Sequence, residues 1–236
     1  MKRSGCDPFE LAFRDYLEGE TGNYLMVNNN KGDDEEWPVA YFFRTYEDMP
    51  ELEKIALKCC SGKVLDVGAG AGCHSLVLQA NGVDVTAMDN KAGLVEVIKQ
   101  RGVQQVIRGD ILNFRDDRFD TLLFLMNGTG IFGTLESFSE FLASARQLLL
   151  PGGQILIDSS DLMYLYEEED GSVLINLNES YYGEVIYRVG YRDCFSEPFP
   201  WLFIDQSTLE QLASEAGFRV EVLYEGDHFE YLAKIF

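Results

Sequence analysis

The stretch KVLDVGAGAGCHSL, which runs from Lys63 to Leu76, decides the fold. A short apolar run ends here at three alternating glycines, Gly68, Gly70 and Gly72, and a helical pattern follows. A strand, a tight turn and a helix start form the setting in which glycine-rich backbone approaches a nucleotide. Glycine suits the turn because a Cβ would block that approach and because the turn can require a positive φ. The stretch therefore predicts a nucleotide-type site at the end of a strand.

The spacing of these glycines separates two classes of nucleotide binder. Dinucleotide binders have the pattern G-x-G-x-x-G, whose last small residue would stand where this chain has Cys73. The pattern here is D-x-G-x-G-x-G, with Asp66 inside the strand, and it resembles motif I of the class I S-adenosylmethionine-dependent methyltransferases. The resemblance implies that this turn faces the amino-acid part and the ribose of S-adenosylmethionine. The residues it implicates are Asp66, Gly68, Ala69, Gly70 and Gly72.

Strands and helices alternate along the middle of the chain. The patterns predict strands at 63–67, 84–88, 104–108, 119–126 and 154–158, and helices at 72–80, 92–100 and 135–149. Such alternation favours a parallel sheet with helical crossovers. A helix at 207–216 and a hairpin around 225–227 end the chain, as in the class I methyltransferases. The expected fold is therefore α/β, a Rossmann-like three-layer αβα sandwich. Its seven-stranded sheet is mostly parallel and ends in a C-terminal antiparallel hairpin.

Two segments are poorly covered by the resemblance. Residues 1–60 contain an amphipathic helix at 8–20, a polar loop at 28–34 and an aromatic stretch at 37–46, and they are interpreted as an N-terminal helical cap or lid. Residues 61–236 would form the class I methyltransferase domain. Within it, 171–206 is expected to be an insertion with a β pair near 172–192, because 173–177 and 184–191 alternate apolar and polar residues. This insertion is a candidate acceptor-binding region.

Composition restricts the partners. The chain has 236 residues, with 19 Lys and Arg against 40 Asp and Glu, so its net charge is -21. Nucleic-acid binding is disfavoured because it needs cations that replace phosphate counterions. A small-molecule acceptor fits better, although the acidity also has a plain explanation in solubility. No apolar run is long enough to span a bilayer and no secretion signal is evident, so we expect a cytoplasmic protein without a membrane segment. The oligomeric state is left open.

Cysteines and histidines give little sign of a metal site. The five cysteines are odd in number and lack a C-x-x-C pair, which indicates reduced thiols. The two histidines, His74 and His228, are too few for a histidine-rich cluster. No metal is expected, but a magnesium site made of carboxylates alone stays open.

Two acids follow the second and third strands. Asp89 stands about twenty residues after the glycine turn, where a carboxylate can accept hydrogen bonds from both ribose hydroxyls, with Asn90 beside it. The same acid serves NAD in dehydrogenases, and it can also cap the next helix. The resemblance places Asp110 against the adenine amino group, with the amide of Ile111 at the ring. An ordinary acidic turn residue is the alternative at Asp110.

Three further residues are candidates for contact with the cofactor. His74 stands in the first turn after the glycines, where a residue satisfied by a neighbour is about as plausible. Arg44 ends an aromatic cluster and would pair the cofactor's carboxylate if this cluster closes over it; an ordinary apolar helix face is the alternative. Asn127 opens Asn-Gly-Thr-Gly, where the family has its motif IV beside the transferring methyl. The absence of an Asn/Asp-Pro-Pro-Tyr/Phe run disfavours nucleobases and protein glutamine as acceptors.

The reaction that the resemblance implies is a metal-independent, in-line displacement. The sulfonium leaving group departs neutral, so the protein mainly has to hold the reactants in line. A general base is needed only if the acceptor is protonated, and Asn127, Asp158 and Asp161 are the weak catalytic candidates. The sequence does not choose among them. Three rival functions stay open: a nicotinamide-dependent oxidoreductase, an aminopropyltransferase, and a non-catalytic module that only binds S-adenosylmethionine.

Overall fold

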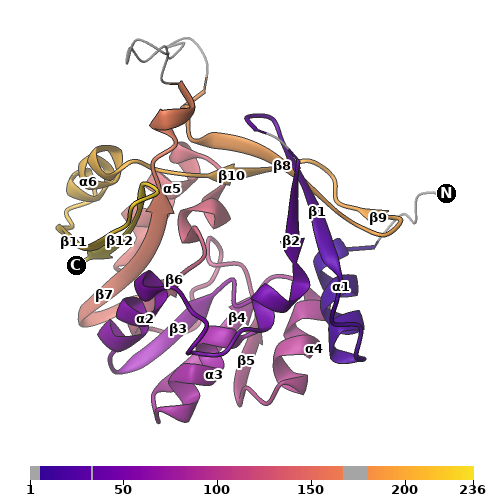
Figure 1. Ribbon diagram of the computed structural model, residues 1–236. Coiled ribbons are helices and arrows are strands. Elements are labelled where there is room, and N and C mark those ends of the chain that lie inside the picture. The colour runs from indigo at the N-terminus through magenta and orange to yellow at the C-terminus, as the bar shows by residue number, and fades with distance from the viewer. Residues whose placement is uncertain (1–5, 33, 167–179) are drawn as a thin grey trace.

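The computed structural model describes residues 6–32, 34–166 and 180–236, and these form two sheets (Figure 1). The larger, called here the large sheet, has seven strands in the order β11-β12-β7-β6-β3-β4-β5. Its strands are β3 (Lys63–Val67), β4 (Asp84–Asp89), β5 (Gln105–Arg108), β6 (Phe119–Phe124), β7 (Leu149–Ser160), β11 (Val220–Glu225) and β12 (Glu230–Ile235). The strands from β3 to β7 pair in parallel, while β12 runs antiparallel to both β7 and β11. The predicted fold class is confirmed, including the C-terminal hairpin.

Helices cover both faces of the large sheet because its parallel strands are apolar on both sides. The helices are α2 (Glu51–Cys59), α3 (Cys73–Ala80), α4 (Ala92–Gln100), α5 (Leu135–Ala145) and α6 (Gln206–Glu215). Within β3 the side chains alternate between the two faces. Val64 packs with α2 and α3, whereas Leu65 and Val67 pack with α5 and α6. These two cores make the three layers of the sandwich.

The boundary between α5 and β7 differs from the sequence prediction. The helix expected over 135–149 ends at Ala145, and β7 already begins at Leu149. Residues 151–153, a Pro-Gly-Gly run, were expected to separate the helix from the strand, but they lie inside β7. The pairing of β7 with β6 shifts register there, between Phe119 and Thr121. A register shift lets one strand continue past an irregular segment that a simple pattern interprets as a break.

A second, antiparallel sheet, called here the small sheet, joins two distant parts of the chain. Its order is β10-β8-β1-β2, with β9 paired to β8. Its strands are β1 (Tyr24–Asn29), β2 (Glu35–Pro38), β8 (Glu184–Tyr191), β9 (Cys194–Phe195) and β10 (Phe199–Leu202). The N-terminal segment is therefore not only a helical cap. It contributes two strands besides helix α1 (Pro8–Leu17) and the 3-10 helix η1 (Val39–Phe43), and β1 pairs with β8 of the insertion. The strand expected at 173–177 lies outside the described residues.

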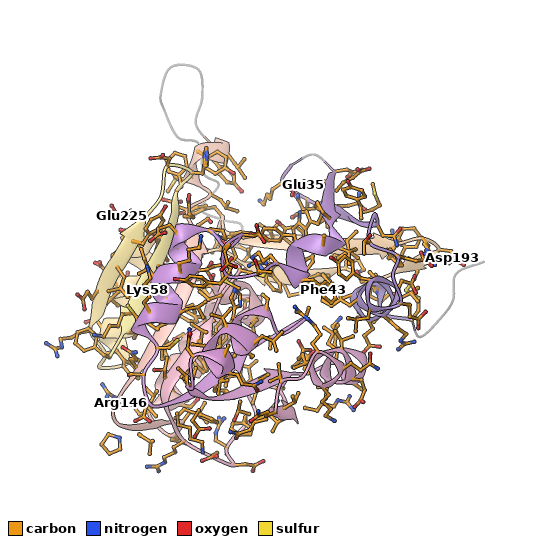
Figure 2. The ribbon with its side chains drawn as sticks, turned by 60° about the horizontal axis from the view of Figure 1, so that its bottom comes forward. Glu35, Phe43, Lys58, Arg146, Asp193 and Glu225 are labelled. Atoms are coloured by element: carbon orange, nitrogen blue, oxygen red, sulfur yellow. A yellow bond between two sulfur atoms is a disulfide. The ribbon has the colours of Figure 1, made fainter. Side chains whose placement is uncertain are left out.

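The cysteine prediction was wrong for one pair. Cys6 and Cys194 form a disulfide, whereas Cys59, Cys60 and Cys73 are free thiols. The two bonded cysteines are 188 positions apart in sequence, yet their Cα atoms lie 6.0 Å apart, within the range for a disulfide. Figure 2 shows Asp193 at the tip of the hairpin between β8 and β9, beside helix α1. The proximity arises from tertiary packing, which the number and spacing of cysteines do not reveal.

The described residues contain neither a membrane-spanning helix nor a cluster of metal-ligating side chains. Among the helices of the described part of the chain, none combines the length and the apolar character that a membrane crossing needs. Across 6–32, 34–166 and 180–236, no three or more His, Cys, Asp or Glu side chains gather in a way that could hold a metal ion.

Candidate cofactor site

The glycine turn closes β3 at the carboxyl edge of the large sheet. Gly68, Gly70 and Gly72 all have positive φ angles, of 70°, 57° and 79°. The amides of Gly68 and Ala69 donate to the carbonyl of Met88, at 2.9 and 3.0 Å, and this bond ties the turn to the end of β4. A Cβ at Gly68 would lie 2.7 Å from Ile131 Cδ1, while one at Gly70 would meet nothing closer than 3.9 Å. A Cβ at Gly68 would therefore require the end of the Ile131 side chain to shift, whereas one at Gly70 would be in ordinary van der Waals contact with Gly68 and Phe13. The positive φ disfavours a side chain at both positions.

Asp66 lies in β3, two residues before the first glycine of the turn. It is buried in β3, and the hydroxyl of Ser75 on α3 donates to its Oδ2 at 2.5 Å. Burial raises the pKa of Asp66, although the nearby His74 and the bond from Ser75 act in the opposite direction. Asp66 therefore connects β3 with α3, the two elements that flank the glycine turn.

Asp89 lies beside the glycine turn, as the spacing predicted. Its Oδ2 accepts from the amide of Gly70 at 3.1 Å, and its Oδ1 accepts from the amide of Lys91 at 3.0 Å. The carboxylate is buried, and burial raises its pKa against the effect of these two amide bonds. Each oxygen keeps a further lone pair, because a carboxylate has about four acceptor positions. Asp89 is not the N-cap of α4, whose N-cap residue is Lys91 and has no side-chain cap; the ribose contact stays a prediction.

The adenine candidates lie after β5. The side chain of Asp110 is exposed and accepts from the amide of Leu112 and from Asn113 Nδ2, both at 3.0 Å. Ile111 is buried in the core that also contains Met88. Asn90 is exposed, and its carbonyl accepts from Arg108 at 3.1 Å. Asp110 therefore has the local bonds of an acidic turn residue while standing at the edge where adenine is expected.

The loop after β6 is strained and tightly held. Met126 and Asn127 both have positive φ angles, of 70° and 54°, a conformation that costs non-glycine residues free energy. Asp158 at the end of β7 fixes this loop by accepting from the amides of Asn127, at 3.0 Å, and Gly128, at 2.8 Å. The hydroxyl of Ser160 donates to Asn127 Oδ1 at 3.0 Å. Consecutive strained residues with dedicated anchors are typical of a functional loop.

The two acidic catalytic candidates have different surroundings. Asp158 is buried, and burial raises its pKa to about 6 against the two amide bonds that it accepts. Asp161 accepts from the amide of Met163 and from the hydroxyl of Tyr182, each at 2.8 Å. Asp158 and Asn127 are brought together by the loop, while Asp161 belongs to the junction with the small sheet.

Arg44 and His74 both contact Glu53, a residue that was not singled out from the sequence. Arg44 is buried and paired with Glu53 of α2 through Nε at 3.2 Å and Nη2 at 2.5 Å. His74 Nε2 lies 2.9 Å from Oε2 of the same carboxylate, the oxygen that also accepts from Arg44 Nε. A signal for Glu53 was present, since it stands on the apolar side of α2 next to Leu52 and four residues before Leu57. A charge on the buried face of a helix requires a partner.

The small sheet lies against the 3-10 helix η2 (Gly128–Phe132), which follows the strained loop. A Cβ at Gly130 would stand only 1.8 Å from the indole of Trp201 on β10, so the ring packs directly on the backbone. Thr129 Oγ1 donates to the carbonyl of Leu202 at 2.9 Å and lies 2.8 Å from Ser159 Oγ. The small sheet is thus fastened at the carboxyl edge of the large sheet, next to β7.

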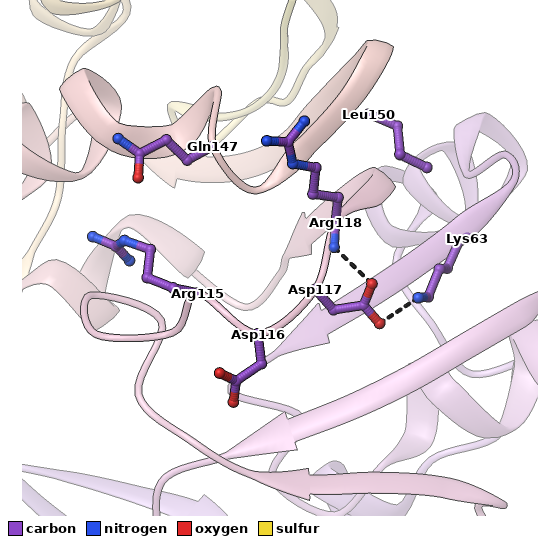
Figure 3. A pocket seen from close by; sticks show the side chains of 7 residues that line it. All are labelled: Lys63, Arg115, Asp116, Asp117, Arg118, Gln147 and Leu150. Atoms are coloured by element: carbon purple, nitrogen blue, oxygen red, sulfur yellow. Dashed lines mark hydrogen bonds and ion pairs between the residues drawn. The ribbon is translucent and has the colours of Figure 1, made fainter.

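Two cavities lie away from the glycine turn. The larger, of about 800 Å³, opens at the amino ends of β3 and β6, the edge opposite the turn (Figure 3). In it Lys63 pairs with Asp117, while Asp116 points away from that pair. The smaller cavity, of about 390 Å³, lies beside Asp161 and Asp205. Neither is lined by Gly68, Gly70 or Gly72. The larger one also lies at the amino edge, whereas a ligand of an open α/β sheet is expected at the carboxyl edge.

The residues of the turn fit S-adenosylmethionine. The cofactor carries no phosphate, and the turn offers backbone without a phosphate-binding side chain. The amide of Gly70 donates to the carboxylate of Asp89, which has lone pairs left for hydroxyl donors.

Comparison with known proteins identifies the family. The profile of a methyltransferase domain family matches residues 65–157. An S-adenosylmethionine-dependent methyltransferase of Bacteroides fragilis, solved in complex with S-adenosyl-L-homocysteine, is 44% identical in sequence. It superimposes with a TM-score of 0.91 over 98% of this chain and 94% of that chain. The chain belongs to the class I S-adenosylmethionine-dependent methyltransferases. Its cofactor is S-adenosylmethionine.

More distant relatives of this methyltransferase carry a more specific name. Demethylmenaquinone methyltransferases of Clavibacter sepedonicus and Tropheryma whipplei are 33% and 28% identical over 101 residues. Each match covers 40% of this chain and 40% of the relative. These matches therefore extend over less than half the length of the curated relatives. They do not transfer an acceptor.

Proposed function

We propose that this methyltransferase transfers the methyl group to a small-molecule acceptor by direct, metal-independent displacement. The observation that carries the proposal is the contact of Trp201 with Gly130, which seats the small sheet beside the strained loop at Asn127. An acceptor bound between the small sheet and this loop would lie at the carboxyl edge that also carries the glycine turn. The insertion would then form the acceptor-binding region together with the N-terminal strands.

Aromatic side chains of the small sheet support a small organic acceptor. Tyr187 on β8 lies with its ring centroid 6.2 Å from Trp37, 6.4 Å from Phe199 and 6.4 Å from Phe203. Aromatic surfaces with a few polar groups are typical of small-molecule sites. The net charge of -21 disfavours nucleic acid as the acceptor. The names of the curated relatives, which describe methylation of a quinone precursor, point in the same direction.

The residues of the chain would act mainly by positioning. Bound S-adenosylmethionine supplies an electrophilic methyl group whose sulfur leaves without charge, so no acid is needed at the leaving atom. Asp89 and the glycine turn would hold the nucleoside and methionyl parts. Asp158 would keep Asn127 and its loop in place against the acceptor, through the two amide bonds described above. Correct placement of two reactants alone can contribute about 7 to 11 kcal/mol.

The first experiment is incubation of the purified protein with methyl-labelled S-adenosylmethionine and a metabolite extract, with and without a metal chelator. We expect label in a low-molecular-weight product and no effect of the chelator. Loss of transfer on chelation would contradict metal independence. Turnover of decarboxylated donor with putrescine would indicate an aminopropyltransferase, and cofactor binding without any product would indicate the non-catalytic module.

We expect the rate of methyl transfer to depend on pH through the ionisation of Asp158. Its carboxylate must be ionised to accept both amides, and its pKa is raised to about 6 by burial. The rate of methyl transfer should therefore rise as the pH increases through about 6. Stability should change in the opposite sense. The folded state binds this proton more tightly than an unfolded chain, in which the pKa is 3.8, so the free energy of unfolding falls as the pH increases from 3.8 to about 6.

The control for this prediction is Asp158→Asn. An amide can accept only one of the two backbone donors and turns its own NH₂ toward the other. The activation free energy should therefore rise by about 1 to 3 kcal/mol and the rate should fall accordingly. The rise near pH 6 should disappear in the variant. Rate profiles of both proteins between pH 5 and 8 make the comparison, and an unchanged rise in Asp158→Asn would assign it to another group.

A further inference from the structure

A buried chain of charges, unused by the proposed reaction, connects the N-terminal segment with the glycine turn. Arg44 directly follows η1, Glu53 lies on α2, and His74 lies in the first turn of α3. The side chains of all three are at least 94% buried. Glu53 accepts two of the hydrogen bonds of Arg44 and contacts His74, so a single carboxylate compensates cations from two separate parts of the chain. Removing this shared partner would take a buried counter-charge from both cations.

The surroundings of His74 favour its charged form. Burial alone would lower the pKa of His74, but Cys73 and Glu53, which contact it, and the nearby Asp66 raise it well above the ordinary value. The pKa of Glu53 is lowered overall, because the bonds and charges of His74 and Arg44 exceed the effect of burial. The neighbouring strand β7 adds Asp158, which interacts with both residues. At neutral pH the network is therefore a carboxylate between two cations.

A second link runs beside the first. Arg101, which ends α4, donates through Nη1 to the carbonyl of Ala71 in the glycine turn at 2.6 Å, and through Nη2 to the carbonyl of Phe43 at 3.4 Å. Its guanidinium also lies over the ring of Phe43, at 4.8 Å from the centroid. The junction of Phe43 and Arg44 is thus attached to the glycine turn at two points, by Arg101 to Ala71 and by Glu53 to His74.

Phe43, at this junction, packs against helix α1. The ring of Phe43, labelled in Figure 2, stacks on Tyr16 at 4.2 Å and meets the edge of Phe13 at 5.3 Å. Phe13 in turn is the side chain nearest to Gly70: its Cε2 lies 3.9 Å from the position that a Cβ would have there. Displacement of Phe43 would therefore move the aromatic side chains that cover the turn.

We propose that Glu53 and Arg101 are positioning residues that couple the seating of the N-terminal segment to cofactor binding. The proposal rests on the proposed function, because it takes the glycine turn as the cofactor site. A cofactor bound at the turn would restrict the motion of Ala71 and His74. Arg101, which bonds Ala71 to Phe43, and Glu53, which bonds His74 to Arg44, would then restrict the motion of Phe43 and Arg44 as well. Coupling is reciprocal, so a seated segment strengthens cofactor binding by the same factor. Neither Glu53 nor Arg101 needs to touch the cofactor.

The test uses Glu53→Gln and Arg101→Gln, with Glu51→Gln on the exposed side of the same helix as the matched control. S-adenosyl-L-homocysteine is titrated by calorimetry, and amide hydrogen exchange is followed at residues 39–44 with and without it. Coupling between sites commonly amounts to about 5- to 150-fold in affinity, and we expect losses in this range for both variants. In both, the ligand should no longer slow exchange at 39–44, whereas Glu51→Gln should match the wild type.

The two histidines of the chain allow a spectroscopic readout. In a His228→Asn background the remaining imidazole signal belongs to His74. The pKa of His74 should lie well above its ordinary value in the parent and should be lower once Glu53→Gln is added. Glu53→Asp, which keeps the charge, should recover part of the affinity and of the protonation. A structural role alone would not produce this recovery together with the loss of ligand-dependent protection.

The outcomes separate this proposal from the function on which it rests. Wild-type binding with unchanged affinity and protection in folded Glu53→Gln and Arg101→Gln overturns the coupling alone. Absence of binding in the wild type overturns the proposed function and the coupling with it. If Glu53→Gln does not fold, Arg101→Gln decides: reduced affinity without ligand-dependent protection supports the coupling, and wild-type values overturn it.

Discussion

Replacing Gly130 with alanine should separate methyl transfer from cofactor binding. The new Cβ would stand 1.8 Å from Trp201 Cε2 and 2.0 Å from its Nε1, so the indole has to move and β10 with it. Overpacking of this kind typically costs about 1 to 3 kcal/mol, and we expect at least that loss in the transfer step because the displaced surface is the one proposed to face the acceptor. The glycine turn and Asp89 are not contacted by the new methyl group, so affinity for S-adenosyl-L-homocysteine should stay close to that of the wild type.

The measurements are transfer rate, ligand affinity and thermal midpoint. Gly22→Ala is the matched control, since a Cβ there meets nothing within 4 Å and its φ is not positive. Adding Trp201→Ala to Gly130→Ala should restore stability lost by the clash, because the two residues are in direct contact and their effects are not additive. Wild-type transfer in Gly130→Ala would show that the small sheet does not form the acceptor side.

Asp89→Ala should have the opposite profile and weaken cofactor binding directly. The carboxylate is buried and accepts from the amides of Gly70 and Lys91, which would both lose their partner. Stranding buried hydrogen-bonding groups costs about 1 to 3 kcal/mol each, and the loss of the expected ribose contacts adds to it. We therefore expect the dissociation constant for S-adenosyl-L-homocysteine to rise by about 5- to 150-fold, at roughly 1.4 kcal/mol for each factor of ten.

Calorimetric titration measures this effect. Asp117→Ala provides the comparison, since Asp117 pairs with Lys63 at the opposite edge of the large sheet and should leave the affinity unchanged. Equal affinity of Asp89→Ala and wild type would mean that the ribose lies elsewhere along the carboxyl edge.

Local pattern was enough for the cofactor half of the molecule. The alternation from residue 63 to 160 predicted the strands that pair in parallel, because a strand buried on both faces is apolar and a crossover helix is amphipathic. The glycines at 68, 70 and 72 all adopt the positive φ that their identity suggested. Asp89 could be placed beside the turn because the ends of adjacent parallel strands meet at one edge. These inferences need only neighbours in sequence and the geometry of one βαβ unit.

Residues whose role depends on distant partners were not predicted in the same way. Arg44 was a candidate for pairing with the cofactor's carboxylate, and the structure pairs it with Glu53, which no motif marks. Asp158 was proposed as a base, and only the structure shows that it holds the amides of a loop 30 and 31 residues away. A carboxylate accepts whichever donors the fold presents, and these donors are not encoded by its own neighbours.

The sequence by itself determined the large sheet and the glycine turn, because both depend on short-range periodicity and on backbone conformations that only glycine adopts easily. The resemblance of this turn to motif I of the family indicated the class of cofactor. Tertiary structure alone decided the small sheet, in which Val27 faces Val189, the disulfide between Cys6 and Cys194, and the shared carboxylate of Glu53. Antiparallel pairing, sulfur proximity and charge compensation are contacts between residues far apart in the chain. They form when folding places those residues side by side, and local sequence does not record that placement.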